Sequence, residues 1–438
     1  MDSRKCQTST VTPAKPGDFS FLFKYERLRE MKQLSSNQYK VPVVVVGMDA
    51  GGLGVTRSLA AHGVPVVAVD DNLQKPGMAT RAAIRTVQMP IRSEQLIDRL
   101  LRLAQELGSK PVLIATLRLP LLLISEHRDL IAQAYHIVLP SHELVVAMEH
   151  KEHLLEIAAK AGVAYPRTVQ LRSERALIEA AELRYPVILK PADNDLKYMK
   201  QFKKAYILEN HPQVAQLAAD IWPSYRDLVL QEWIRGHDDT LYFCLQYRNA
   251  DGKTLASFVG RKLLSWPPGK GATAACTAAP ANHRGEVERI TDRMFDAVGL
   301  RGFGSVELKL DSVSGQFFLI EPTVGRTDQQ EEVATLNGIN IPHAAYCDQI
   351  GAPLPRQTQT TASHTWSNPL WTRWARQRLH AQNLRAPRLR IDNGRVFDAY
   401  FRPADPLPGL FNLLQQVPEP LALVRSCLRR RPVRIWRK

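Results

Sequence analysis

The chain has 438 residues and a formal net charge of +15, with 45% hydrophobic and 23% charged residues. This length is enough for two or three domains, and the composition is that of a globular protein. No apolar run is long enough to cross a bilayer, residues 1–40 contain no apolar signal-peptide core, and the five cysteines form no CxxC pair. These features argue against a spanning segment, a disulfide framework and a zinc site, and predict a reducing, cytoplasmic location.

Residues 41–150 have the pattern of an open parallel α/β domain that follows an N-terminal extension, residues 1–40. The run VPVVVV is typical of a strand buried on both faces, and the glycines at 47, 51, 52 and 54 lead into a helical stretch. A second strand ends at Asp70, where an acid that binds ribose could stand. An NAD-dependent oxidoreductase is therefore an alternative, although the spacing is G-x-x-x-G-G-x-G and close helix packing also explains these glycines.

Residues 151–352 mix antiparallel strand patterns with a few helices, which predicts an α+β domain. Lys151 opens a helix, Lys190 ends the strand YPVILKP before its proline, and Lys204 opens the next strand-like segment. A lysine stem can lie along apolar surface while its ammonium reaches a phosphate. Each lysine alone is unremarkable, but the three in this order indicate a phosphate-binding site. The 192–203 loop between them is a candidate lid.

Two further segments supply polar groups at strand ends. The strand VLQEWI carries Glu232, Trp233 and Ile234, and Asp239 follows it, where a carboxylate can accept hydrogen bonds from ribose hydroxyls. The segment GRKLL contains Arg261 and Lys262. Because adjacent strand residues point to opposite faces, only one of these two cations should reach the site directly, and we expect it to be Arg261.

The stretch RGFGSVELKLDSVSGQFFLIEPTVGR, residues 301–326, is the most informative part of the chain. It predicts two strands joined by a turn, with Glu307 in one strand and Glu321 in the other. A carboxylate among apolar strand neighbours is costly unless its charge is compensated. Paired carboxylates suit Mg²⁺, which leaves the rest of its shell to water and phosphate. Arg326 lies five residues past Glu321, where the strand should end.

The order of these segments resembles the ATP-grasp superfamily over residues 41–350, in the carboxylate–amine ligase branch that includes D-aspartate ligases and carbamoyl-phosphate-synthase-like proteins. The resemblance implies a Rossmann-like pre-ATP-grasp domain followed by a two-subdomain ATP-grasp fold. It implies an ADP-forming ligase that joins a carboxylate to an amine through an acyl phosphate. The cofactors it implies are ATP and Mg²⁺, with Mn²⁺ as an alternative ion, and the substrates are small molecules.

The resemblance also assigns roles to individual residues. Lys151, Lys190, Lys204 and Lys262 would contact the nucleotide, Glu232, Trp233 and Ile234 would form the adenine hinge, and Asp239 would bind the ribose. Arg261 and Arg326 would act on the transferring phosphoryl group and the substrate, and Glu307, Glu321 and Thr323 would hold the metal. Thr323 stands where the family usually has asparagine, the spacing from Glu321 to Arg326 is one residue longer than usual, and the loop after Lys190 lacks glycines. These departures motivate an alternative, a catalytically silent ATP-binding regulatory module.

Residues 353–438 form a basic region rich in Trp and Arg. Residues 371–438 contain 15 Lys and Arg against four Asp and Glu, and so carry +11 of the net charge. Such a region suits an anionic membrane surface, which would place the protein at the inner face of the membrane. A solvated surface with some core tryptophans is the plainer alternative. No nucleic-acid-binding motif is present. A homo-oligomer stays open.

Overall fold

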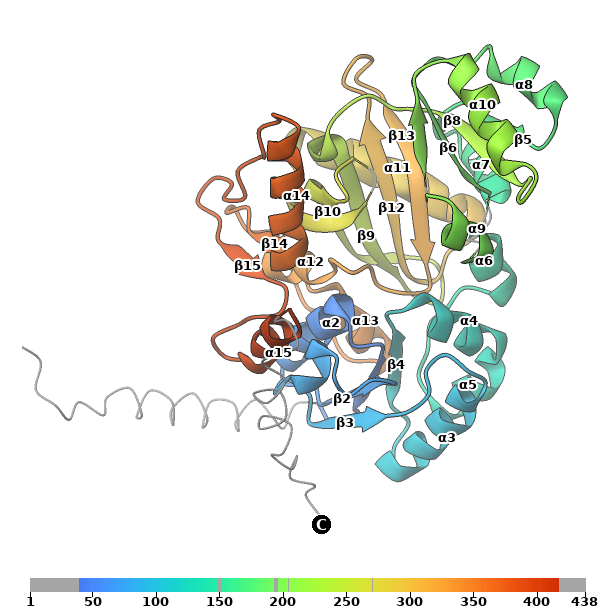
Figure 1. Ribbon diagram of the computed structural model, residues 1–438. Coiled ribbons are helices and arrows are strands. Elements are labelled where there is room, and N and C mark those ends of the chain that lie inside the picture. The colour runs from blue at the N-terminus through green and yellow to red at the C-terminus, as the bar shows by residue number, and fades with distance from the viewer. Residues whose placement is uncertain (1–38, 149–150, 193–195, 204, 270, 417–438) are drawn as a thin grey trace, which may run out of the picture.

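The computed structural model describes residues 39–148, 151–192, 196–203, 205–269 and 271–416, organised around three β-sheets (Figure 1). The strands are β1 Val43–Val46, β2 Val66–Asp70, β3 Arg85–Gln88, β4 Val112–Ala115, β5 Thr168–Leu171, β6 Val187–Pro191, β7 Tyr206–Leu208, β8 Leu228–Glu232, β9 Leu241–Arg248, β10 Thr254–Trp266, β11 Ala272–Ala278, β12 Gly302–Leu310, β13 Phe317–Val324, β14 Thr365–Ser367 and β15 Val396–Asp398. The α-helices are α2 Ala50–Ala60, α3 Gln95–Leu107, α4 Arg118–Glu126, α5 Arg128–Ala134, α6 His142–Ala147, α7 Lys151–Lys160, α8 Glu174–Ala180, α9 Leu196–Gln201, α10 His211–Ile221, α11 Ala281–Val298, α12 Glu332–Leu336, α13 Ile341–Gln349, α14 Pro369–Ala381 and α15 Leu407–Gln415. Two 3₁₀ helices are η1 Pro76–Ala79 and η2 Asp238–Thr240. None of the helices in these ranges is long and apolar enough to cross a membrane.

The first sheet is parallel and has the order β3-β2-β1-β4, which confirms the predicted Rossmann-like domain. Its central strand β1 consists of four valines, all fully buried, because helices cover both faces of a parallel sheet. A Cβ at Gly52 would lie 1.8 Å from the carbonyl oxygen of Gly47, so glycine lets α2 approach the end of β1.

The environment of Asp70 does not favour the dinucleotide alternative. Its carboxylate is fully buried and accepts hydrogen bonds from the Met48 backbone N–H at 2.7 Å and from Lys75 Nζ at 3.0 Å. Asp70 therefore holds the β1–α2 turn in place instead of offering its oxygens to a ribose.

The second sheet is small and antiparallel, with the order β5-β8-β6-β7. Helices α8 and α10 pack on it and complete a separate hydrophobic core, which includes Leu189, Val214 and Leu230. This sheet lies beyond β13, beside the largest sheet (Figure 1). A backbone hydrogen bond of 2.8 Å from Leu319 of β13 to Ala164 joins the segment before β5 to the large sheet.

The third sheet has seven strands in the order β13-β12-β9-β10-β11-β14-β15. One face carries Tyr242, Cys244 and Leu308, which share a core with α11. The other face carries Phe243 and Tyr247, which share a core with helices α2 and α13. Strand alternation therefore sorts each strand into two sets of side chains, and Glu307, Lys262 and Lys309 belong to the second face.

Residues beyond 352 extend this sheet. Strand β14 pairs with β11, β15 pairs with β14, α14 packs on β10 and β11, and α15 packs against η1 of the first domain. The domain boundary expected at residue 352 stays a prediction, but the sheet itself continues across it.

A buried ion pair ties this C-terminal segment to the first domain. Arg57 Nε of α2 lies 3.0 Å from Asp405 Oδ2, and each side chain is only 9% exposed. Asp405 also accepts hydrogen bonds from Thr80 Oγ1 at 2.6 Å and from the Arg81 backbone N–H at 2.8 Å. Arg57 in turn donates to the carbonyl oxygens of Ala399 and Tyr400.

Asp405→Ala would leave the buried Arg57 guanidinium without its counter-charge. This substitution should therefore lower the free energy of unfolding by about 3–5 kcal/mol. Chemical denaturation measures this change. The matched control is Glu106→Ala, which breaks the exposed Arg85–Glu106 pair and should cost about 1 kcal/mol or less. Equal effects of the two substitutions would show that the C-terminal segment is not held by Asp405.

Candidate active site

Two acidic residues meet at the edge of the large sheet. Glu307 of β12 and Glu321 of β13 are direct cross-strand partners, so their side chains share one face of the sheet. Thr323 pairs with Ser305 in the same ladder, one alternation step further along that face. The two carboxylates and the hydroxyl are hard oxygen donors, and this donor set fits Mg²⁺.

A buried lysine neutralises one of these acids. Lys262 of β10 forms an ion pair with Glu307, and only 4% of Lys262 is exposed. Burial works against the charged ammonium, but Glu307, then Glu321 and Asp238, outweigh it and raise the pKa of Lys262. Burial also raises the pKa of Glu307, and Lys262 opposes that change.

Arg261 does not lie with the acidic pair. It is the cross-strand partner of Tyr242, whose side chain belongs to the core under α11, on the opposite face of the sheet. The expectation that Arg261, and not Lys262, reaches the site directly is therefore wrong. Its reason was sound, since adjacent residues do point to opposite faces, but the alternation alone does not tell which face holds the site.

Lys190 belongs to a hydrogen-bonded chain of side chains on the small sheet. Its Nζ donates to Gln231 Oε1 at 2.9 Å, and Gln231 Nε2 donates to Thr168 Oγ1 at 3.0 Å. Burial raises the pKa of Tyr165, a hydrogen bond with Gln231 opposes this, and the charge of Glu321 adds to it. Tyr165 is thus close to both Gln231 and Glu321 and places the Lys190 side of the small sheet next to β13.

The segment after β8 links the two sheets. Glu232 accepts a hydrogen bond from the Arg184 backbone N–H at 2.8 Å, and the Trp233 N–H donates to the Pro186 carbonyl at 3.0 Å. Ile234 is buried. These contacts anchor the predicted hinge to the start of β6.

Lys309 is a residue of this region that sequence reasoning missed. Its ammonium lies 4.4 Å from the centre of the Trp233 ring, and it sits two residues past Glu307, on the same face of β12. Burial lowers the pKa of Lys309 to about 8. Its spacing from Glu307 was the signal that could have revealed it.

Of the adjacent acids in η2, the structure brings Asp238 toward the site. Asp238 accepts backbone hydrogen bonds from Ser265 at 2.7 Å and Gly269 at 2.8 Å, and its charge acts on Lys262. Asp239, predicted to bind ribose, instead acts on Tyr242 of the opposite face. Its ribose role stays a prediction that this placement does not support.

The remaining predicted residues are Arg326, Lys151, Lys204 and the loop after Lys190. Arg326 follows β13 and its Nη1 donates to the Thr327 carbonyl at 3.4 Å. Lys151 begins α7, but its side chain lies outside the described residues, as do Lys204 and residues 193–195 of the predicted lid. Their roles stay predictions.

Two further acids beyond β13 were also missed. Asp328 accepts a hydrogen bond from Ser305 Oγ at 2.6 Å, which places it on the face of Glu307. Burial, followed by the charge of Asp328, raises the pKa of Glu331 to about 8. Gly51 of α2 makes room for this segment, since a Cβ there would lie 3.2 Å from the Asp328 carbonyl oxygen. No local sequence pattern signals either acid.

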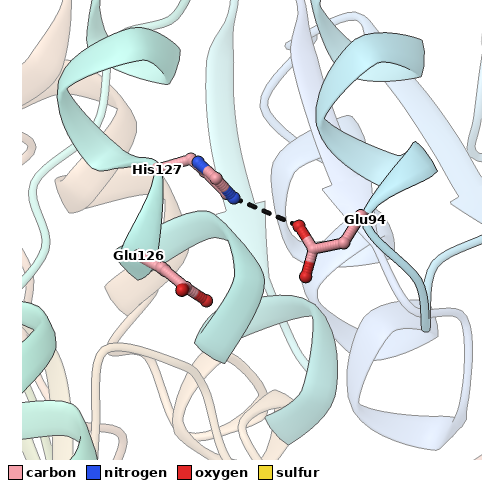
Figure 2. Close-up of side chains that lie close together, drawn as sticks. All are labelled: Glu94, Glu126 and His127. Atoms are coloured by element: carbon pink, nitrogen blue, oxygen red, sulfur yellow. Dashed lines mark hydrogen bonds and ion pairs between the residues drawn. The ribbon is translucent and has the colours of Figure 1, made fainter.

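A separate group, Glu94, Glu126 and His127, gathers on the first domain (Figure 2). His127 Nε2 and Glu94 Oε2 lie 3.1 Å apart and face one another, but both glutamates are exposed. The group is a surface cluster, and it shares no residue with the acidic pair on β12 and β13.

Comparisons with known proteins agree with this geometry. A D-aspartate ligase from Enterococcus faecium is 24% identical over 330 residues, which cover 72% of the chain and 77% of that ligase. The structure of an N5-carboxyaminoimidazole synthetase from Staphylococcus aureus is similar with a TM-score of 0.59 and 13% identity, over 80% of this chain and 87% of that one. The biotin carboxylase domain of a Hydrogenobacter thermophilus 2-oxoglutarate carboxylase, solved with MgADP and bicarbonate, is similar with a TM-score of 0.57 and 15% identity, over 74% and 73%. No protein-family model matches the chain.

The sheet order, the acidic strand pair and these likenesses all agree with the fold expected from the sequence. The chain has the ATP-grasp fold, and it is similar in sequence to a carboxylate–amine ligase.

Proposed function

We propose that the protein is an ATP-dependent carboxylate–amine ligase that forms an amide or peptide bond and releases ADP and phosphate. The observation that carries this proposal is the direct cross-strand pairing of Glu307 with Glu321, beside the buried Lys262. The similarity to a D-aspartate ligase supports the same reaction class and makes D-aspartate the first substrate to test.

In this proposal ATP lies against the face of the large sheet that carries the acidic pair. Glu307 and Glu321, with Thr323 as a weaker oxygen donor, would hold Mg²⁺, which neutralises phosphate charge when it is bound. Lys190 and Lys262 would contact the phosphates. The segment Glu232–Ile234 would contact the adenine, since it joins the small sheet to the large one near Lys309.

Charge explains why the reaction needs these side chains. An attacking carboxylate and the γ-phosphate are both anionic, so they repel until fixed positive charge lies between them. Lys262 is well suited to this task because its neighbours keep it protonated while burial shields it from water. Such a preorganised charge stabilises the transition state without reorganising during the reaction.

The chemistry then proceeds in two displacements. A carboxylate oxygen attacks the γ-phosphorus, the bond to the β-phosphate oxygen breaks, and ADP leaves behind an acyl phosphate. A neutral amine attacks the acyl carbon, loses a proton, and displaces inorganic phosphate. Water must be excluded between these steps because the acyl phosphate hydrolyses. Arg326, at the end of β13, is our candidate for holding the substrate carboxylate.

The first test is a panel of small carboxylates and amino acids, including D-aspartate, with ADP release as the readout. We expect ADP to form in the presence of Mg²⁺ only when both a suitable acid and a suitable amine are supplied. If ATP binds and no pair of substrates releases ADP, the silent ATP-binding module would replace the ligase.

The second test is Glu321→Gln, which keeps the size of the side chain and removes its charge. We expect Mg²⁺-dependent ADP release to fall on the order of 100-fold, because the metal loses an anionic ligand where charge develops. The midpoint of chemical unfolding should stay unchanged. Glu286→Gln, on the exposed surface of α11, is the matched control and should retain full activity. Full turnover by the Glu321 variant would refute the metal assignment.

We also propose that the basic surface of α14 contacts an anionic membrane. Arg373, Arg376 and Arg378 are exposed on this helix together with Trp374, and a shallow hollow lies between Trp374 and Trp266. The neighbouring α15 exposes Leu410 and Leu413. Arginines near a tryptophan and exposed leucines have the chemistry of an interfacial surface that contacts anionic lipid.

Sedimentation with vesicles tests this surface. Each arginine near anionic lipid contributes about 1 kcal/mol, so Arg373→Glu with Arg378→Glu should weaken binding to phosphatidylserine-containing vesicles by about tenfold or more. The control pair Arg289→Glu with Arg301→Glu changes the net charge equally, from positions outside α14, and should leave binding nearly intact. If neither pair alters sedimentation, or the protein does not bind vesicles, α14 is an ordinary solvated surface.

A further inference from the structure

Lys309 is a buried cationic side chain that the proposed reaction does not use. It lies on β12 with only 4% of its surface exposed. Its ammonium is 4.4 Å from the centre of the Trp233 ring. Strand alternation places it on the face of Glu307, one step nearer to the hinge segment.

Among the residues that the structure describes, Lys309 has no hydrogen bond and no ion pair. The charges of Asp238, Asp311 and Glu307 act on Lys309, but the oxygens of these acids have other partners. Asp238 accepts from the Ser265 and Gly269 backbone, Asp311 accepts from Val313 and Ser314, and Glu307 pairs with Lys262. A lysine ammonium has three hydrogens to donate. The Trp233 ring lies beside this ammonium but accepts no conventional hydrogen bond, so the three donors are available to a ligand.

The position of Lys309 indicates what the missing acceptor is. The acidic pair marks the phosphate end of the site, and Trp233 marks the hinge end. Two residues of a strand span about 7 Å, so Lys309 lies that far along β12 from Glu307, beside the hinge. A nucleotide that extends from the acidic pair to the hinge would bring its base, and not its terminal phosphates, to this ammonium.

We propose that Lys309 donates a hydrogen bond to an acceptor atom of the purine base, and is thereby a specificity-determining residue for the nucleotide. This inference rests on the proposed function, because it takes the nucleotide from there. Purine rings offer unprotonated nitrogens as acceptors, and guanine also offers a carbonyl oxygen. A cationic donor next to Trp233 would therefore bind a purine more tightly than a ligand without a base.

The test compares Lys309→Met with the unsubstituted protein, using MgATP and magnesium tripolyphosphate as ligands in isothermal titration calorimetry. Methionine keeps an unbranched chain and removes the donors. Since a hydrogen bond from a charged group is lost, we expect ATP affinity to fall about tenfold or more while tripolyphosphate affinity stays unchanged. Lys253→Met, in the exposed turn between β9 and β10, is the matched control and should change neither affinity.

The other outcomes are distinct. Equal losses for both ligands would mean that Lys309 binds phosphate, and no loss for either would mean that it has a structural role; each result overturns the inference. If the unsubstituted protein binds neither ligand, the proposed function fails first. Lys309→Leu, which also removes the donors, provides a second variant if the methionine variant does not fold, and the same preferential loss of ATP affinity is expected from it.

Discussion

The pairing of Glu307 with Glu321 across two neighbouring strands is the constraint on which the site depends. Two carboxylates held opposite one another repel: burial raises the pKa of Glu307, and the charge of Glu321 raises it further. Lys262 relieves it from the next strand but one in the sheet, as a cation with only 4% of its surface exposed. If Mg²⁺ is bound as we propose, Glu307 and Glu321 would hold it, and its charge would offset the same repulsion.

The pleat of the large sheet decides which side chains join that pair. Glu307, Lys262 and Lys309 share one face, while Arg261 and Leu308 point to the other face, where α11 covers an apolar core. The face that carries these charged residues also carries apolar side chains, which form a second core with α2 and α13. The site is therefore built at the point where one face of a single sheet changes from packing against helices to carrying charge.

The basic C-terminal region contributes both buried residues to the fold and exposed arginines to the surface, and its composition does not separate the two. Trp366 and Ala399 are fully buried, and Arg57 with Asp405 fastens the region to the first domain. Three exposed arginines lie on α14, which packs on β10 and β11, and further exposed arginines follow that helix. Much of this region up to residue 416 is thus part of the fold, and it exposes several of its arginines to solvent.

The sequence by itself determined the strands that carry Glu307 and Glu321 and the Rossmann-like first domain, because strand periodicity, buried valine runs and paired acids are local patterns. The ATP-grasp fold was expected from the resemblance of the order of these segments to that superfamily. It could not choose Lys262 over Arg261 or Asp238 over Asp239, since that choice depends on how a strand is registered against its neighbours. It also could not reveal Lys309, Asp328 or the Tyr165–Gln231–Lys190 connection. Those contacts join segments far apart in the chain, and only the packing of two sheets brings them together.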